Sequence, residues 1–322
     1  MLLNTACAKT AKELQESSKN RYFDCIMVVT GELDRVVENL SNQYGLIKRT
    51  ESCGEKANEV VFPMGDIMLR VIQPLVGDTV FGRHLERFGG GICCVRENIP
   101  KERQEAELAR YQALGIDILQ SEEDETGTTC YLDTWDMFGG MIAIRFDKSP
   151  AVRNYANDRK LTQINVVTDD VDRTVAQLTN ILEIGPWSIG TLNNQTVSNP
   201  GLLVDGRMCA PEFHFQLGIT FYSNIEFEVI QPVKGPTVYQ EYLNRHGRGF
   251  HHIKEVIPPE QWEKTLDGYK KEGMVLSIRG SVGPTSFAYL DCEKAFDFVV
   301  ELGDGIPANP LPEGYDEYSY PH

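Results

Sequence analysis

The sequence predicts an α+β protein made of two similar halves, with two βαβββ units in each half and four in the whole chain. Internal repetition is the first observation behind this prediction. Tyr-Leu-Asp-Thr at 131–134 returns as Tyr-Leu-Asp-Cys at 289–292, and Val-Ile-Gln-Pro at 71–74 returns at 229–232, so both pairs are 158 residues apart. The second observation is periodicity, because alternating apolar residues predict strands and spacings of three and four residues predict helices between them.

Each half is expected to begin with a short strand and an amphipathic helix. The first strands are Cys25–Val29 and Gln163–Val167, which are 138 residues apart. In the second half, Asp169 and Asp170 precede the helix and are suited to cap its first turn. Apolar residues spaced by four, three and four positions mark the buried face of that helix, and they are Val171, Val175, Leu178 and Leu182.

The remainder of the second half predicts further strands around a second helix. Residues 225–230 alternate between two faces, so Phe227 and Glu228 should point in opposite directions. A strand after Gly249 leads into the second helix, and two closing strands end at Phe298–Leu302.

The second half is also about twenty residues longer than the first, between its first strand and its Gln-Pro landmark. The segment Gly190–Glu212, rich in Asn, Gly and Pro, is the expected place of this insertion. Long loops in compact domains often carry function, so the insertion is expected to form a lid or a pocket wall.

These observations divide the chain into four regions. We expect an N-terminal extension at 1–20, an N-terminal domain at 21–148, a C-terminal domain at 158–303 and an acidic, Pro-rich tail at 304–322. The linker between the two domains is expected within residues 147–160.

Composition and charge exclude several classes of function. The 322 residues carry 47 acidic and 31 basic side chains, a net charge of −16, which disfavours nucleic acid and anionic membranes as partners. No run approaches the ~18 apolar residues of a spanning helix, and the N-terminus lacks the apolar core of a signal peptide. The eight cysteines form no CxxC pair, so we expect reduced thiols in a cytoplasmic protein. For the assembly of the protein, a homodimer is the option we consider.

Five segments of the second half stand in an order and spacing that resemble the vicinal oxygen chelate superfamily, which includes glyoxalase I, methylmalonyl-CoA epimerase and extradiol dioxygenases. They are Gln163–Val167, Ile184–Trp187, Glu228–Pro232, Gly249–Ile253 and Val299–Leu302. The resemblance covers residues 21–303 and is nearest to the methylmalonyl-CoA epimerase-like and glyoxalase I-like branches. It implies two glyoxalase-like domains with curved, cup-shaped mixed sheets.

The resemblance also implies one divalent metal ion inside the second cup, with one ligand from each of four strands. Carried over by position, the ligands are Gln163, Glu228, His252 and Glu301. One amide oxygen, two carboxylates and one imidazole suit Zn²⁺, Mn²⁺, Co²⁺, Ni²⁺ or Fe²⁺. Taken singly, each of these residues is more often an ordinary strand residue or a core histidine than a ligand, so the prediction depends on the four occurring together in the family order.

The first half departs from this pattern. Cys25 stands in the place of Gln163, Arg70 in that of Glu228, Cys94 in that of His252, and Ile144 or Arg145 in that of Glu301. A guanidinium offers only donors and cannot bind a cation, so this half is expected to be degenerate and retained for packing.

The resemblance implies an isomerase, epimerase or glyoxalase-like lyase that removes a proton next to a carbonyl group of a small oxygenated substrate. A metal ion would stabilise the enolate or enediolate, with Glu301 as the base that carries the proton and Glu228 as its partner. Two alternatives stay open. One is an extradiol or 2-oxo-acid dioxygenase, although a single imidazole departs from the 2-His-1-carboxylate triad. The other is a non-enzymatic small-molecule binding protein.

Four further polar residues lie near the expected ligands. His214, Arg248 and Lys254 are candidate substrate contacts, while the commoner role of such residues is solvated surface charge. His251 should face the opposite side of its strand from His252 and is expected to be structural.

Overall fold

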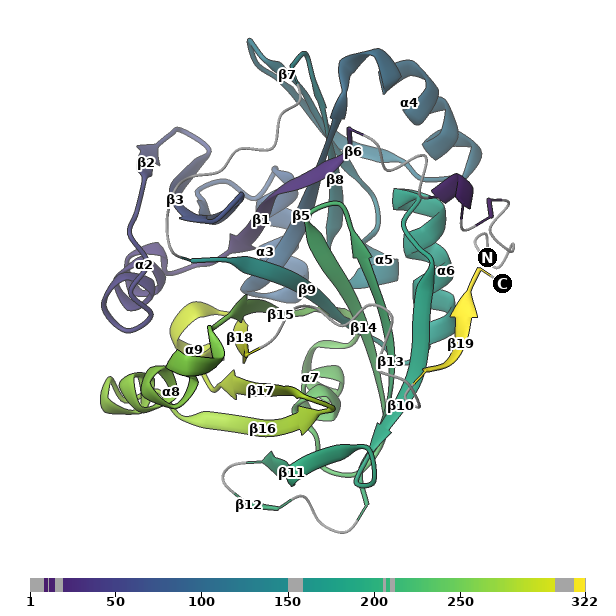
Figure 1. Ribbon diagram of the computed structural model, residues 1–322. Coiled ribbons are helices and arrows are strands. Elements are labelled where there is room, and N and C mark those ends of the chain that lie inside the picture. The colour runs from purple at the N-terminus through teal and green to yellow at the C-terminus, as the bar shows by residue number, and fades with distance from the viewer. Residues whose placement is uncertain are drawn as a thin grey trace.

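The structure of the protein is a computed structural model that describes residues 9–10, 12–14, 20–149, 159–204, 207–208, 212–304 and 316–321. It confirms the predicted α+β class and the four βαβββ units, which form two strongly curved mixed sheets (Figure 1). Most of the predicted extension and linker lies outside the described residues.

The N-terminal sheet has eight strands in the order β2-β3-β4-β1-β5-β8-β7-β6. β1 and β5 lie at its centre and pair antiparallel, and each also pairs in parallel with the last strand of its own unit. The elements of this domain are β1 (Tyr22–Val29), α2 (Leu33–Asn42), β2 (Thr50–Cys53), β3 (Ala57–Met64), β4 (Ile67–Pro74), α3 (Val80–Phe88), β5 (Gly91–Pro100), α4 (Gln104–Ala113), β6 (Ile118–Glu123), β7 (Gly127–Leu132), α5 (Trp135–Phe138) and β8 (Met141–Asp147).

The C-terminal sheet repeats this arrangement around the central pair β9 and β15. Its order is β12-β11-β16-β17-β18-β15-β9-β14-β13-β10-β19. The elements are β9 (Leu161–Val167), α6 (Val171–Leu182), β10 (Trp187–Asn193), β11 (Val197–Val204), β12 (Arg207–Met208), β13 (His214–Tyr222), β14 (Ile225–Lys234), α7 (Val238–His246), β15 (Gly249–Val256), α8 (Trp262–Lys271), β16 (Leu276–Val282), β17 (Thr285–Leu290), α9 (Glu293–Phe296), β18 (Val299–Gly303) and β19 (Asp316–Tyr320).

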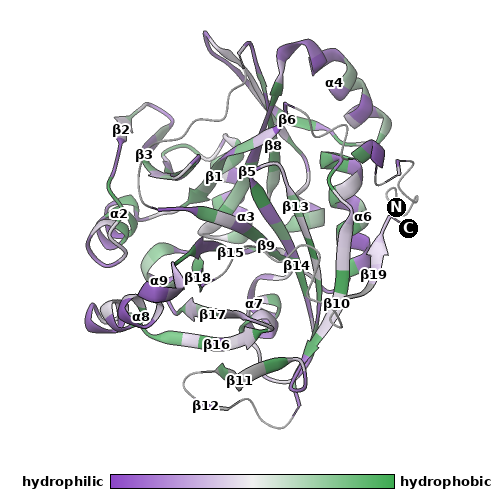
Figure 2. Cartoon of the chain, viewed as in Figure 1, coloured by the Kyte–Doolittle hydropathy of each residue, from purple (hydrophilic) through white to green (hydrophobic). Residues whose placement is uncertain are grey.

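Local sequence explains where the helices begin and end. The Asp170 side chain caps α6 by accepting a hydrogen bond from the backbone N–H of Arg173 at 3.0 Å, and Glu183 ends the helix in a left-handed conformation. Helices α4 and α8 lie at the periphery and are largely hydrophilic on their outer sides (Figure 2). Among the described residues, no helix combines the length and apolar character needed to cross a membrane.

The insertion lies at the edge of the C-terminal cup. β11 leaves the first unit of this domain and pairs antiparallel with β16, the edge strand of the second unit, so that Val197 lies opposite Val282. The insertion therefore bridges the two units with backbone hydrogen bonds. The tail contributes β19, which pairs with the other sheet edge through β10, where Tyr320 lies opposite Trp187.

The two domains share one hydrophobic core. Phe23 of β1 packs edge-to-face on Phe227 of β14, with ring centroids 4.8 Å apart. The buried Arg21 guanidinium pairs with Glu97 of its own domain at 2.6 Å and with Glu183 of the other at 3.0 Å. Because a single core and a buried ion pair cross the boundary, each cup is held on a common scaffold.

Candidate metal centre

Three of the four predicted ligands meet inside the C-terminal cup. Glu228 of β14, His252 of β15 and Glu301 of β18 are buried, and one candidate ligand atom from each lies within 4.8 Å of the others. The Nε2 atom of His252 is 3.0 Å from Glu301 Oε2 and 3.3 Å from Glu228 Oε2. Of the described residues, this is the one cluster of three such side chains with metal-binding spacing.

Strand pairing explains why residues so distant in sequence converge. β9 runs between β14 and β15, and Asn165 of β9 lies opposite Glu228. On the other side of β9, His251 and His252 together lie opposite Asn165, because the register shifts between Phe250 and Ile253. This β-bulge bends the strand and re-aims its side chains, as bulges near functional sites commonly do.

The fourth predicted ligand, Gln163, lies on the same face of β9 as Asn165, two residues away along the strand. Its Nε2 donates to Glu226 Oε1 at 2.6 Å, which leaves Gln163 Oε1 buried and without a partner among the described residues. Asn165 is similar, since its Nδ2 donates to Glu228 Oε2 at 2.9 Å and its Oδ1 has no described partner. Buried oxygens are normally satisfied, so two free amide oxygens beside two carboxylates and an imidazole fit a bound divalent cation.

Hydrogen bonds from two tyrosines and an ion pair with Lys254 support the ligand cluster. The Tyr289 hydroxyl donates to Glu301 Oε2 at 2.8 Å, and the Tyr239 hydroxyl donates to that of Tyr289 at 2.9 Å. Lys254 Nζ lies 2.8 Å from Glu301 Oε1. The Lys254 ammonium group therefore holds one oxygen of Glu301, and the Tyr289 hydroxyl holds the other.

The electrostatics of the cup are those of crowded buried carboxylates. Burial raises the pKa of Glu226 to about 8. Burial opposes ionisation of Glu301 too, but Lys254 and His252 outweigh it and hold the pKa of Glu301 below its usual range. Burial opposes the charged form of His252, and its hydrogen bonds to Glu228 and Glu301 outweigh this and raise its pKa. A dication would compensate this negative charge directly.

A cavity of ≈ 80 Å³ opens beside the ligands. Gln163, Glu226, Glu228, Lys254 and Glu301 lie on its polar side, and Lys254 is the only basic residue among the described residues that line it. The opposite wall is apolar and includes Leu192, Phe215, Leu217, Ile219, Ile230 and Phe287. A water needs roughly 10–15 Å³ of such volume, so the cavity suits a small organic molecule.

The other candidate residues lie elsewhere. Arg248 forms two hydrogen bonds with Asp169, at 2.6 and 3.1 Å, and lines a pocket between the domains instead of the cup. His214 begins β13 and is not among the residues that line the cup cavity. His251 lines the interdomain pocket. Its Nδ1 lies 2.8 Å from Nδ1 of His252, so the two rings are joined by a hydrogen bond.

Three residues of the centre were not singled out as site residues from sequence. Tyr289 belongs to the repeated Tyr-Leu-Asp motif, so its signal was present but was used only to align the halves. Glu226 stands two residues before Glu228, and strand alternation places both on one face. Asn165 stands two residues after Gln163 in the same way.

The N-terminal cup has apolar and paired side chains in the corresponding positions. Arg70 pairs with Glu59, and Cys25 and Cys94 are fully buried. The expectation that Ile144 or Arg145 replaces Glu301 is wrong. Tyr289 lies opposite Glu301, whereas its counterpart Tyr131 lies opposite Ala143.

This correction has a local cause. The prediction of Ile144 or Arg145 assumes an insertion of one residue at Gly139-Gly140. Gly139 instead ends α5 in the left-handed conformation, with φ 60°, just as Asp297 ends α9 with φ 65°. The two turns are therefore equivalent, and the offset of 158 residues continues without a shift to the last strand.

No protein-family model and no curated protein matches the sequence. Over nearly its whole length the chain is similar to the structure of a triple mutant of 4-hydroxymandelate synthase from Streptomyces coelicolor, with a TM-score of 0.62 at 12% identity, covering 89% of this chain and 93% of that chain.

Other solved structures match a smaller part of the chain. One is a methylmalonyl-CoA epimerase variant from Streptomyces coelicolor in complex with 2-nitronate-propionyl-CoA, with a TM-score of 0.34 at 18% identity, covering 39% of this chain and 97% of that chain. Another is methylmalonyl-CoA epimerase from Mycobacterium tuberculosis, with a TM-score of 0.33 at 17% identity, covering 39% and 87%. The topology and the whole-length similarity together show that this chain has the two-domain fold of the vicinal oxygen chelate superfamily.

Proposed function

We propose that the protein is a metal-dependent enzyme that moves a proton next to a carbonyl group of a small oxygenated compound, as an isomerase, an epimerase or a glyoxalase-like lyase. The observation that carries this proposal is the buried cluster of Glu228, His252 and Glu301 at the base of a cavity with an apolar wall. A buried cluster of carboxylates without this purpose would cost stability.

Four side chains would hold the metal ion: Gln163 through its free Oε1, Glu228, His252 through Nε2, and Glu301. A bound dication polarises a carbonyl oxygen and stabilises the negative charge that develops on it. The mixture of oxygen ligands with one imidazole is compatible with Zn²⁺, Mn²⁺, Co²⁺, Ni²⁺ or Fe²⁺.

Glu301 and Glu228 are the proposed proton carriers, with Glu301 as the base. They come from different strands, and Oε2 of Glu301 and Oε2 of Glu228 lie 3.0 and 3.3 Å from His252 Nε2. Two carboxylates on opposite sides of one carbon can remove a proton on one face and return it on the other. Asn165 fixes Glu228 and Tyr289 fixes Glu301, so neither carboxylate needs to reorganise before it acts.

The cavity suggests the kind of substrate. Its volume of ≈ 80 Å³ suits a molecule of few heavy atoms, and its apolar wall suits an alkyl or aryl group. Of the three candidate substrate contacts, Lys254 is the one that lines the cavity, where its ammonium group could bind an anionic end of the substrate.

Two measurements test the proposal. Elemental analysis of the purified protein should find close to one divalent metal per chain. The metal-loaded protein should then exchange α-hydrogen for deuterium in D₂O, followed by proton NMR, for a member of a panel of hydroxyketones, 2-oxo acids and acyl thioesters.

Matched variants make this test specific. Glu301→Gln should abolish exchange and Glu228→Gln should reduce it by at least about 100-fold. Cys94→Ala, which alters the N-terminal counterpart of His252, should leave exchange unchanged. A metal-loaded protein that exchanges none of the panel would contradict the proposal.

A dioxygenase is the second candidate, favoured by the whole-length similarity to a 4-hydroxymandelate synthase. The Gln163 amide is the feature that weighs against it, because non-haem iron oxygenases use two histidines and one carboxylate. Oxygen uptake by the Fe²⁺-loaded protein in the presence of a 2-oxo acid or a catechol, without α-hydrogen exchange, would favour this second function.

A further inference from the structure

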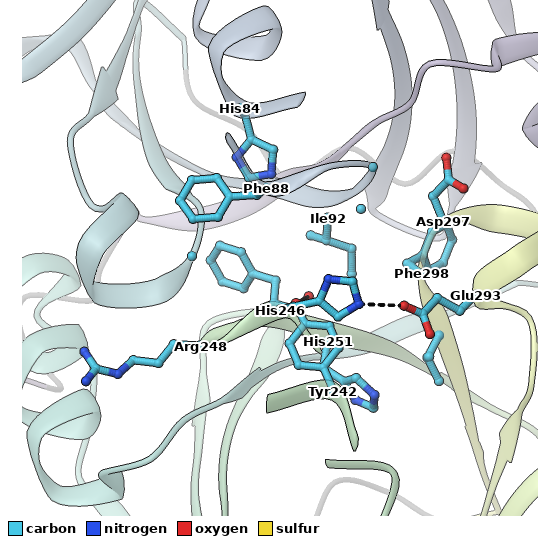
Figure 3. A pocket seen from close by; sticks show the side chains of 15 residues that line it. His84, Phe88, Ile92, Tyr242, His246, Arg248, His251, Glu293, Asp297 and Phe298 are labelled. Carbon is cyan, nitrogen blue, oxygen red and sulfur yellow. Dashed lines mark hydrogen bonds and ion pairs between the residues drawn. The ribbon is translucent and has the colours of Figure 1, made fainter. Parts of the chain in front are cut away.

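A small pocket lies at the boundary between the two domains (Figure 3). Its volume is ≈ 30 Å³, and both domains line it. α3 supplies His84, α7 supplies Tyr242 and His246, and the bulge in β15 supplies His251. His246 Nε2 lies 3.0 Å from Glu293 Oε1. Figure 3 marks this contact with a dashed line and shows His251 beside Tyr242.

His251 connects this pocket to the metal centre. Its Nδ1 lies 2.8 Å from Nδ1 of His252, and both side chains are buried. Consecutive residues of a regular strand point to opposite faces and could not meet in this way. The β-bulge opposite Asn165 removes that constraint and brings the two rings together.

The contact has a fixed consequence for the proton between the two rings. Two ring nitrogens at 2.8 Å share one hydrogen, so one Nδ1 donates and the other accepts. When Nε2 of His252 binds a metal ion through its lone pair, the ring proton must reside on Nδ1. His252 is then the donor, and Nδ1 of His251 is the acceptor.

We propose that His251 is a positioning residue for His252: by accepting this hydrogen bond it selects the tautomer, and the ring orientation, in which Nε2 of His252 is free to bind a metal ion. The inference rests on the proposed function. Histidine ligands generally donate their second N–H to a carboxylate or a carbonyl group. Here an imidazole takes that place.

The surroundings of His251 keep its ring in position. Tyr242 lies edge-to-face at 4.8 Å between centroids and Tyr239 at 5.8 Å. In the N-terminal domain the counterpart of His251 is Cys93, whose thiol donates to the backbone carbonyl of Met27 at 3.3 Å and not to Cys94. The link between neighbouring side chains is therefore found in the cup with metal ligands and not in its duplicate.

Three variants and the wild type test the inference with Zn²⁺ as the probe, in competition with a chromophoric chelator. His251→Phe keeps an aromatic ring but removes the acceptor, and it should weaken Zn²⁺ binding by about 10- to 100-fold. His251→Asn returns an acceptor oxygen near the position of Nδ1 and should recover most of the affinity. His246→Phe alters the same pocket at a residue whose ring bonds Glu293, and it should bind Zn²⁺ like the wild type.

Long-range ¹H–¹⁵N NMR gives a readout that a packing defect would not change. In the Zn²⁺-loaded wild type, His252 should be protonated on Nδ1 and His251 on Nε2. Unchanged affinity in His251→Phe, no recovery in His251→Asn, or a proton on Nδ1 of His251 would overturn this inference and leave the proposed function intact. A wild-type protein that binds no Zn²⁺, Mn²⁺, Co²⁺, Ni²⁺ or Fe²⁺ would overturn the proposed function and this inference with it.

Discussion

The two cups of this protein are built on equivalent strands in the same order, but their inward-facing side chains differ. In the C-terminal cup, Glu228, His252 and Glu301 surround a point at which a cation fits. In the N-terminal cup, the positions of His252 and Glu301 hold Cys94 and Ala143, which pack in an apolar cluster.

The difference shows how the fold separates scaffold from chemistry. The order of the eight equivalent strands and the central antiparallel pairing are the same in both domains, so they do not determine whether a cup binds a ligand. A few inward-facing side chains do. The N-terminal cup gains stability from buried apolar side chains and pairs its Arg70 with Glu59, whereas the C-terminal cup keeps unsatisfied buried oxygens that cost stability until a ligand binds.

Thiol reactivity provides the largest expected contrast. The N-terminal cup should be closed to reagents, because Cys25, Cys93 and Cys94 are fully buried and burial raises the pKa of each thiol. In the native protein they should react with a disulfide reagent at least about 1000-fold more slowly than the exposed Cys53. Peptide mapping after timed labelling measures each rate, and labelling of Cys94 as fast as Cys53 would show that this cup is open.

Metal addition should stabilise only one cup. A ligand that binds the folded state alone stabilises it by about 4 kcal/mol at 1000 times its Kd. The wild type should therefore gain thermal stability with Zn²⁺ and lose it with a chelator, whereas His252→Ala should show neither change. Cys94→Ala serves as the matched control and should respond like the wild type. An equal response from His252→Ala would place the metal outside the C-terminal cup.

The overall fold could be predicted from sequence, because strand and helix periodicity are local and the two halves repeat. Three features of the site could not. The β-bulge at His251 depends on pairing with β9, and the contact of β11 with β16 joins segments about eighty residues apart. The equivalence of Gly139 and Asp297 depends on a left-handed backbone that glycine adopts freely and aspartate adopts less often.

Truncation in the apolar cup should cost stability without affecting metal binding. Met141 is fully buried in the N-terminal cluster, so Met141→Ala leaves a cavity and should lower the free energy of unfolding by about 3 kcal/mol. Chemical denaturation measures this loss, and Zn²⁺ affinity should stay within twofold of the wild type. A large loss of Zn²⁺ affinity would show that packing in the N-terminal cup affects metal binding in the C-terminal cup.

The equivalent tyrosines of the two cups provide the smallest and most specific contrast. Tyr289 donates to Glu301 at 2.8 Å, whereas Tyr131 donates to the exposed Glu122 at 3.1 Å. Removing a hydrogen bond that orients a metal ligand typically weakens binding 10- to 100-fold. Tyr289→Phe should therefore weaken Zn²⁺ binding by about tenfold, which corresponds to about 1.4 kcal/mol, and Tyr131→Phe should leave it unchanged. Because both changes remove one hydroxyl from the same strand position of duplicate units, a similar loss in both variants would mean that the effect comes from packing and not from the ligand.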